Sequence, residues 1–211
     1  MDRLDEISEA LQAQFEEKNA ARDQAIVKSR MLIRNCANAI RAVHRRQWEE
    51  AQAGLETARA AADELTSGVE GHPDLYYSGY MQDALKELVE AFATYAIVRG
   101  EPLPTPEDLS VVGATYLNGL AEAATELRRF ALDIIRKGHD QEAEHLLGQM
   151  ESIYHILMTF DFPDALTYGL RRRSDTLRSV IQRTQGDITQ SIRQQRLEHA
   201  LADLEKKLNL D

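Results

Sequence analysis

Apolar residues recur at intervals of three and four along most of this chain, and no segment alternates with a period of two for long enough to form a β-strand. Intervals of three and four place side chains on one face of an α-helix, whereas a half-buried strand needs alternation. The 211 residues include only five prolines and eleven glycines, so long uninterrupted helices are possible. The sequence therefore predicts an all-α fold, with a single domain over residues 1–211.

Proline and glycine mark where the expected helices begin and end. The clearest break runs from Gly100 to Pro106 and contains three prolines. Thr105 is expected to cap the next helix, with Pro106 as its first residue and two acidic residues in its first turn. A second break at 161–163 precedes a last long helix. The expected helices cover roughly residues 4–40, 48–65, 85–96, 106–134, 140–160 and 164–208.

Charge is distributed unevenly along the chain. The net charge is −10, which argues against a protein whose whole surface binds nucleic acid. Two tracts are nevertheless basic. Residues 22–46 contain seven basic residues and one aspartate, and residues 171–196 contain seven arginines and two aspartates. These tracts are the places where an anionic partner could bind.

Cys36 is the only cysteine, so the chain has no internal disulfide, which is typical of a reducing compartment. The acidic, helical N-terminus does not resemble a secretory signal, and no apolar run approaches the ~18 residues of a membrane span. We therefore expect a soluble, cytoplasmic protein, with Cys36 as a small core residue. The six histidines form no His-x-x-x-His pair and no Gly-rich phosphate loop is present, so neither a zinc site nor a P-loop is predicted.

Two expected helices each carry a pair of glutamates one turn apart. Glu87 and Glu90 lie opposite the apolar stripe of one helix, and Glu122 and Glu126 lie opposite that of the next. Carboxylates at this spacing can reach one ion, and oxygen ligands of this kind suit Mg²⁺ or Mn²⁺. Because clustered carboxylates repel one another, removing one is expected to leave folding intact or slightly improved. The alternative is a solvated surface, the commoner fate of glutamates on a helix.

The residues around these glutamates resemble the translin family. The similar stretches are Leu85–Ala91, which contains a Glu-x-x-Glu motif, and Tyr116–Leu127. The resemblance extends to residues 29–45 and, weakly, to residues 168–170. Within the family the closer resemblance is to the catalytic branch of translin-associated factor X. In that branch the corresponding acids bind metal and cleave RNA. Carried over, they fall on Glu87, Glu90, Glu122 and Glu126, with Glu122 where the branch more often has aspartate.

The resemblance implies an antiparallel bundle of about seven helices. It also implies a hollow oligomer, usually an octamer, that handles single-stranded RNA, and possibly single-stranded DNA, on its inner surface. Apolar stripes near both chain ends support a homo-oligomer, because such stripes need a partner surface. The stripes consist of Leu4, Ile7 and Leu11, and of Leu197, Leu201, Leu204 and Leu208.

Candidate nucleic-acid-binding residues lie in the first basic tract and near 77–80. Arg30, Arg34, Arg41 and Arg45 fall within ~60° of one another on a helix and could follow a phosphate backbone. They could equally bridge to acidic helices of the same protein or a partner. Tyr77 and Tyr80 could stack on bases, although packing is the commoner fate of tyrosines on helices.

Three functions from different classes remain open. The first is a Mg²⁺- or Mn²⁺-dependent endoribonuclease of the translin type. The second is a protein of the same fold that binds single-stranded RNA or DNA without cutting it. The third is an all-α nucleoside triphosphate pyrophosphohydrolase, which also places paired glutamates around Mg²⁺. The four acids favour the first over the second, because carboxylates would repel phosphate in a simple binding protein.

Overall fold

The computed structural model describes residues 2–137 and 140–208. Every regular element within those ranges is helical, so the predicted all-α fold is confirmed. The elements are α1 (Asp2–His44), α2 (Trp48–Ser67), α3 (Pro73–Tyr76), α4 (Gly79–Arg99), α5 (Gly113–Ile135), α6 (Asp140–Leu157), α7 (Asp164–Thr167) and α8 (Leu170–Leu208). Two of these eight, α3 and α7, are single turns of four residues, so the number of long helices is close to the expected seven.

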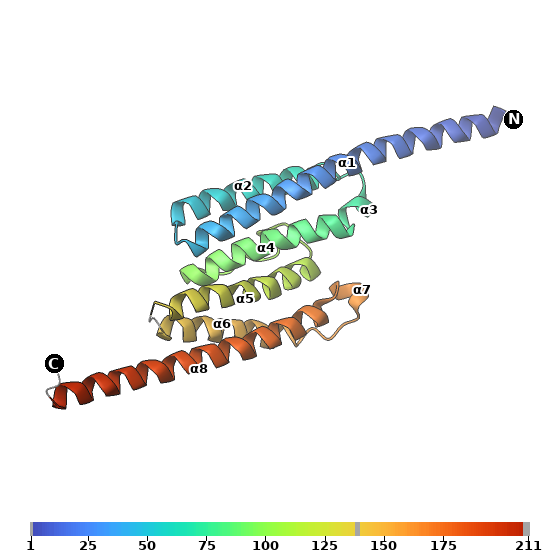
Figure 1. The fold of residues 1–211 in the computed structure, drawn as a ribbon. Coiled ribbons are helices and arrows are strands. Elements are labelled where there is room, and N and C mark those ends of the chain that lie inside the picture. The colour runs from blue at the N-terminus through green and yellow to red at the C-terminus, as the bar shows by residue number, and fades with distance from the viewer. Residues whose placement is uncertain (1, 138–139, 209–211) are drawn as a thin grey trace.

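The long helices pack side by side in an antiparallel stack (Figure 1). α2 packs on α1, α1 on α4, and α4 on α5, while α6 and α8 both pack on α5 and on each other. The N-terminal part of α1 and the C-terminal part of α8 project from the stack in opposite directions (Figure 1). In this packing order, α4 and α5 occupy the middle of the molecule, with α1 on one side of them and α8 on the other.

The core consists of two groups of buried apolar side chains. One lies between α1, α2 and α4 and includes Leu32, Leu65 and Met81. The other lies between α5, α6 and α8. Cys36 is fully buried in the first group, as predicted, and its burial raises the pKa of the thiol above its ordinary value. Tyr95 packs against both groups, so the two halves form a continuous interior.

The predicted helix start at Pro106 is wrong: α5 begins seven residues later, at Gly113. The predicted capping interaction is nevertheless present: the N–H of Asp108 donates to Oγ1 of Thr105, and the N–H of Thr105 donates to the Asp108 carboxylate. This single turn stops at Ser110, whose φ of 54° is left-handed. The cap is therefore genuine, but the chain cannot continue as a helix past Ser110.

The apolar stripes at the two chain ends are exposed on the projecting parts of α1 and α8. Leu4 is 67% exposed and Leu197 is 60% exposed, and Ile7, Leu11, Leu201 and Leu204 are also exposed. The side chain of Leu208 lies outside the described residues. None of the described helices is both long enough and apolar enough to cross a bilayer.

Gly119 allows α4 and α5 to approach each other closely. A β-carbon at Gly119 would lie 2.5 Å from Cβ of Val89 and 2.7 Å from the carbonyl oxygen of Lys86. Both distances are shorter than real Cβ contacts, so no other residue fits without moving one helix. Because Glu122 lies one turn after Gly119, this contact also sets how close the α5 glutamates come to those of α4.

We predict that Gly119→Ala lowers the free energy of unfolding by about 1–3 kcal/mol, because the added methyl group overlaps the backbone of α4. Gly186→Ala in α8 is the matched control. Its β-carbon would meet no atom within 4 Å, so it should stabilise the protein by about 0.5–1 kcal/mol through helix propensity. Urea unfolding followed by circular dichroism measures both. Equal stabilities for the two variants would contradict the close contact.

Candidate functional site

Three glutamates from α4 and α5 converge in the middle of the molecule. Glu87 and Glu90 come from α4 and Glu122 from α5, and one carboxylate oxygen of each lies within 4.8 Å of the others. All three are half-buried, so they do not form an ordinary solvated surface. The predicted convergence of acids from the two helices is therefore present for three of the four residues.

Glu126, the fourth predicted acid, lies beside this group and has a different partner. Its Oε1 is 2.5 Å from Nε2 of His44, near the end of α1, and 3.8 Å from a nitrogen of Arg129. The His44 side chain is nearly buried and its ring lies 5.4 Å from that of Phe130. His44 thus fixes Glu126 to α1 while the other three glutamates face one another.

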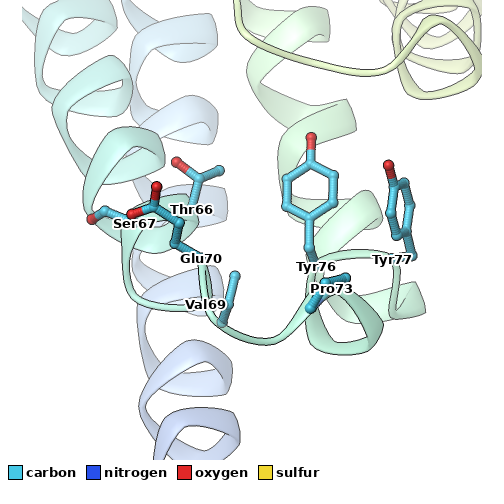
Figure 2. A pocket seen from close by; sticks show the side chains of 7 residues that line it. All are labelled: Thr66, Ser67, Val69, Glu70, Pro73, Tyr76 and Tyr77. Atoms are coloured by element: carbon cyan, nitrogen blue, oxygen red, sulfur yellow. The ribbon is translucent and has the colours of Figure 1, made fainter.

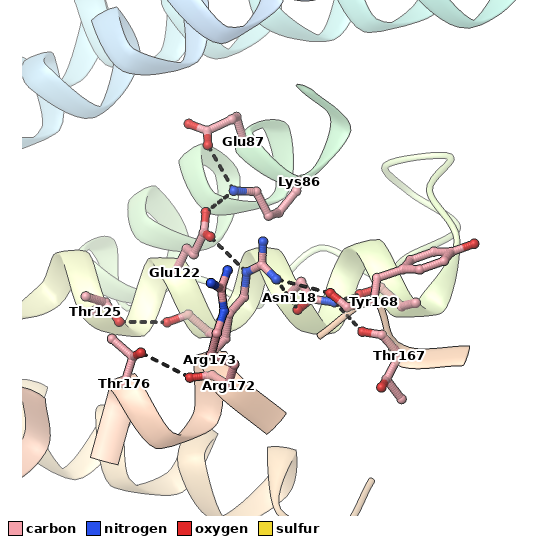
Figure 3. A network of polar contacts seen from close by, with 12 residues as sticks. Lys86, Glu87, Asn118, Glu122, Thr125, Thr167, Tyr168, Arg172, Arg173 and Thr176 are labelled. Atoms are coloured by element: carbon pink, nitrogen blue, oxygen red, sulfur yellow. Dashed lines mark hydrogen bonds and ion pairs between the residues drawn. The ribbon is translucent and has the colours of Figure 1, made fainter. Parts of the chain in front are cut away.

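Two cations neutralise part of the acidic cluster (Figure 3). The Lys86 ammonium donates to the carboxylate of Glu122 and, at 3.2 Å, to that of Glu87. Nε of Arg173, from the first turn of α8, donates to the other oxygen of Glu122 at 3.0 Å. Glu122 therefore has a cation on each oxygen, and the cluster draws its positive charge from both α4 and α8.

Arg173 is held in place by a polar network that extends to α7. Its Nη1 donates to Oδ1 of Asn118 and to the carbonyl oxygen of Tyr168 (Figure 3). The Asn118 amide in turn donates to the carbonyl oxygen of Thr167 at 2.7 Å. Tyr168 and Gly169 both have left-handed φ angles, which turn the chain so that α8 starts beside α5. This tight turn is what brings the arginine to the cluster.

The roles of Lys86 and Arg173 were not predicted from the sequence. Lys86 could have been noticed because Val89 and Ala93, three and seven residues later, are apolar and share its helix face. A lysine on a buried face needs an acidic partner. Arg173 gave no comparable signal, since it is one of three consecutive arginines and only the 168–169 turn selects it.

Glu90 differs from the other two glutamates because no cation contacts it. Among the described residues, its carboxylate takes part in no hydrogen bond or ion pair. Burial, followed by the neighbouring charges of Glu87, Glu122 and Glu126, raises the pKa of Glu90 from 4.5 to about 8. Lys86 offsets only part of this effect. A carboxylate in this situation is stabilised by any added positive charge.

A pocket of about 410 Å³ opens beside the cluster. Carboxylates form one side of it, and arginine and threonine side chains from the start of α8 form the other. Its lining residues are Glu90, Ala121, Glu122, Thr125, Arg172, Arg173 and Thr176. A pocket with acids facing arginines can hold a cation and an anion next to each other.

The four arginines predicted to bind nucleic acid are all exposed, three of them on α1 and Arg45 in the turn that follows it. Arg41 donates to Asn38, and Arg45 pairs with Glu50 at 3.2 Å. Arg30 and Arg34 form no ion pair with any described residue. Within the described residues, only Arg45 bridges to an acidic residue of another helix, Glu50 of α2, and bridging to a partner stays a prediction.

The two predicted tyrosines have different environments. Tyr77 is 56% exposed, and its ring meets that of Tyr76 edge to face at 4.9 Å. Both rings line a pocket between the end of α2 and α3, together with Thr66, Ser67, Val69, Glu70 and Pro73 (Figure 2). Tyr80 packs against the apolar core and its hydroxyl is buried, so it is not placed to stack on a base.

The cluster fits a hard divalent cation. It offers carboxylate oxygens only, which suit Mg²⁺ and Mn²⁺ and not zinc. Glu90 has no positive partner, so a cation would relieve its burial cost. Glu87, Glu90 and Glu122 are the residues that can hold such an ion, and Glu126 is close enough to raise the pKa of Glu90.

We predict that metal-free protein loses stability as the pH rises from about 5 to 8. Glu90 binds its proton more tightly in the folded chain, so the folded state is favoured while that proton is bound and loses this advantage as it dissociates. The loss should be of the order of 2–4 kcal/mol in unfolding free energy. Glu90→Gln should reduce this slope and be the more stable protein at pH 8.

Urea unfolding in chelator at several pH values measures the slope. Glu107→Gln, a change at an exposed glutamate outside the cluster, is the matched control and should keep the wild-type slope. A Glu90→Gln protein with the same pH dependence as wild type would contradict the assignment.

Comparison with known proteins gives relatives that match over nearly the whole chain. No protein-family model matches. An uncharacterized protein of Methanocaldococcus jannaschii is 30% identical over 186 residues, which are 87% of this chain and 82% of the relative. The crystal structure of AfC3PO, from Archaeoglobus, is 36% identical with a TM-score of 0.80, covering 87% of this chain and 95% of that one.

Two further structures extend the comparison. AfC3PO in complex with duplex RNA aligns with a TM-score of 0.76. NeC3PO without ligand aligns with a TM-score of 0.79 at 21% identity, which shows the shared fold. C3PO proteins are members of the translin family. With 36% identity over 95% of the AfC3PO chain, and with the helix arrangement described above, this protein belongs to the translin family.

Proposed function

We propose that this protein is a metal-dependent endoribonuclease that acts on single-stranded RNA, as in the catalytic branch of its family. The observation that carries the proposal is the cluster of Glu87, Glu90 and Glu122 at the edge of a pocket whose opposite side is lined by arginines. Glutamates are mostly exposed, and they are rarely buried unless they have a partner. Here three are half-buried together, and the carboxylate of one of them, Glu90, contacts no cation.

Each group in the pocket has a proposed task. Glu87, Glu90 and Glu122 hold Mg²⁺ or Mn²⁺, with Glu126 completing the acidic set from its place beside His44. When bound, such an ion supplies an activated water and neutralises charge on the phosphodiester. Arg172, which is exposed at the pocket, binds a non-bridging phosphate oxygen of the RNA.

The RNA strand is proposed to reach the pocket along the basic tracts of α1 and α8. Arg30 and Arg34 are exposed and unpaired among the described residues, so they are available to phosphates. AfC3PO has been solved with duplex RNA, which supports RNA as the ligand of this chain and makes duplex RNA the necessary comparison in any binding test. Tyr77 is the tyrosine that is exposed for stacking.

The acting form is proposed to be a homo-oligomer, an octamer, within the cytoplasm. The exposed apolar residues of the two projecting helix ends support an assembly, because six large side chains there are 48–67% exposed in the isolated chain.

Binding of nucleic acid without cleavage is the second candidate, and one observation favours it. Lys86 and Arg173 neutralise Glu122, so the cluster repels phosphate less than four free carboxylates would. The argument that a binding protein has no use for these acids is weaker for that reason. Variants of the acids themselves separate the two functions.

We predict that Glu87→Ala and Glu126→Ala each reduce RNA cleavage by at least about 100-fold, because groups around one ion act as a unit. Glu107→Ala, outside the cluster, should cleave like wild type. The assay follows a labelled single-stranded RNA with Mn²⁺, with and without chelator. Equal cleavage by all three variants and wild type would refute the catalytic proposal, and absence of cleavage with retained binding would favour the second candidate.

We predict that Arg30→Ala combined with Arg34→Ala weakens binding of single-stranded RNA and lowers the slope of log affinity against log salt by about 1–2, because each phosphate contact releases counterions. Arg136→Ala is the control, because Arg136 is an exposed arginine outside both basic tracts and pairs with Asp133. Fluorescence anisotropy at several salt concentrations, with single-stranded and duplex RNA, measures both. An unchanged slope, or tighter binding of duplex than of single strands, would contradict this part of the proposal.

A further inference from the structure

Lys86 lies where a cation bridging the two helices would lie. Its ammonium contacts carboxylates on both α4 and α5, those of Glu87 and Glu122, and these are two of the three ligands of the candidate metal centre. Lys86 is only 8% exposed. Burial alone lowers the pKa of Lys86. The carboxylates of Glu122 and Glu87 raise it by more than burial lowers it, so the pKa of Lys86 lies above its ordinary value.

We propose that Lys86 is a built-in counter-cation that holds the acidic cluster together in the metal-free protein and competes with the divalent ion for Glu87 and Glu122. This inference rests on the proposed metal centre and adds a residue that controls its affinity. Lys86 does not contact substrate, so it is a positioning residue.

The charge balance of the cluster explains why such a residue is needed. Three half-buried carboxylates within 4.8 Å would repel one another strongly in a partly dry site. Lys86 and Arg173 supply two positive charges, and both side chains contact the carboxylate of Glu122. Lys86 also contacts the carboxylate of Glu87. Glu90 receives no contact from either and is left for the incoming ion.

Arg173 and Lys86 differ in how firmly they are held. Arg173 has acceptors besides Glu122, namely Asn118 and the Tyr168 carbonyl. Lys86 contacts glutamates of the cluster alone, among the described residues. An ion that takes those carboxylates therefore displaces the lysine and leaves the arginine in place.

A small cavity beside Lys86 offers room for the displaced ammonium. It has a volume of about 30 Å³, and its lining includes Lys86, Asp83, Gln82 and Thr115 as well as Arg173. Gln82 and Thr115 are hydrogen-bonded to each other, whereas Asp83 forms no ion pair with any described residue. Asp83 lies one turn before Lys86 on α4, at a spacing where the two side chains can pair.

The test is a calorimetric titration of the full-length protein with Mn²⁺ in the absence of RNA. Lys86→Met keeps the length of the side chain and removes its charge, and it should bind Mn²⁺ at least about 10-fold more tightly. Lys18→Met is the control, because it also removes an ion pair, with Asp74, but far from the cluster. Its Mn²⁺ affinity should equal that of wild type.

A second readout concerns stability. Metal-free Lys86→Met should melt below wild type, and saturating Mn²⁺ should restore more stability to it than to wild type. If Lys86→Met does not fold, Lys86→Gln replaces it in both measurements. Lys86→Arg, which keeps the charge, should retain weak, wild-type-like Mn²⁺ affinity.

The outcomes separate this inference from the proposed function. The proposed role of Lys86 is overturned if Lys86→Met and Lys86→Gln bind Mn²⁺ no more tightly than wild type. It is also overturned if neither wild type nor any Lys86 variant binds Mn²⁺. A third outcome is that the wild-type protein binds Mn²⁺ but does not cleave RNA, while Lys86→Met binds Mn²⁺ more tightly. That outcome would support the proposed role of Lys86 and refute the proposed nuclease activity.

Discussion

The close contact of α4 with α5 is the constraint on which the rest of the site depends. Gly119 lets the backbone of α5 lie against Val89 and the carbonyl oxygen of Lys86. One turn later on α5, Glu122 then reaches the α4 glutamates and the Lys86 ammonium. A wider separation would leave the same residues as two unconnected acidic pairs, each facing solvent. The convergence of the three carboxylates thus depends on the absence of a side chain at Gly119.

Charge compensation is the second organising effect, and it distinguishes the glutamates from one another. The sequence led to the expectation that removing any one of them would relieve repulsion. That reasoning suits Glu90, which has no cation and a raised pKa. It does not suit Glu122, because removing it would leave Lys86 and Arg173 without their shared partner. Glu126 differs again, since its partner is the nearly buried His44.

The sequence predicted those features that follow from periodicity. Helix positions, the burial of Cys36 and the placement of each glutamate pair on one helix face all depend on spacings of three and four within helices, which are local properties. Gly100 likewise ends α4 in the left-handed conformation expected of a terminal glycine. The resemblance to the translin family, confirmed by the relatives, added the pairing of the two helices.

The features that were missed depend on contacts between distant segments. Arg173 reaches Glu122 only because Tyr168 and Gly169 turn the chain, and His44 reaches Glu126 across 82 positions. The helix start at Pro106 was predicted wrongly for a local reason: the capping residues do their work, but the left-handed Ser110 ends the turn. Capping signals describe a first turn and do not determine the length of the helix that follows.

The central claim is that the acidic cluster between α4 and α5 is a metal centre. Anomalous diffraction from crystals grown with Mn²⁺, recorded at the manganese absorption edge, tests it most directly. The account predicts a peak among the carboxylates of Glu87, Glu90 and Glu122, with the Lys86 ammonium moved away from Glu87. Crystals with no peak at the cluster, and with Lys86 still bridging Glu87 and Glu122, would contradict it.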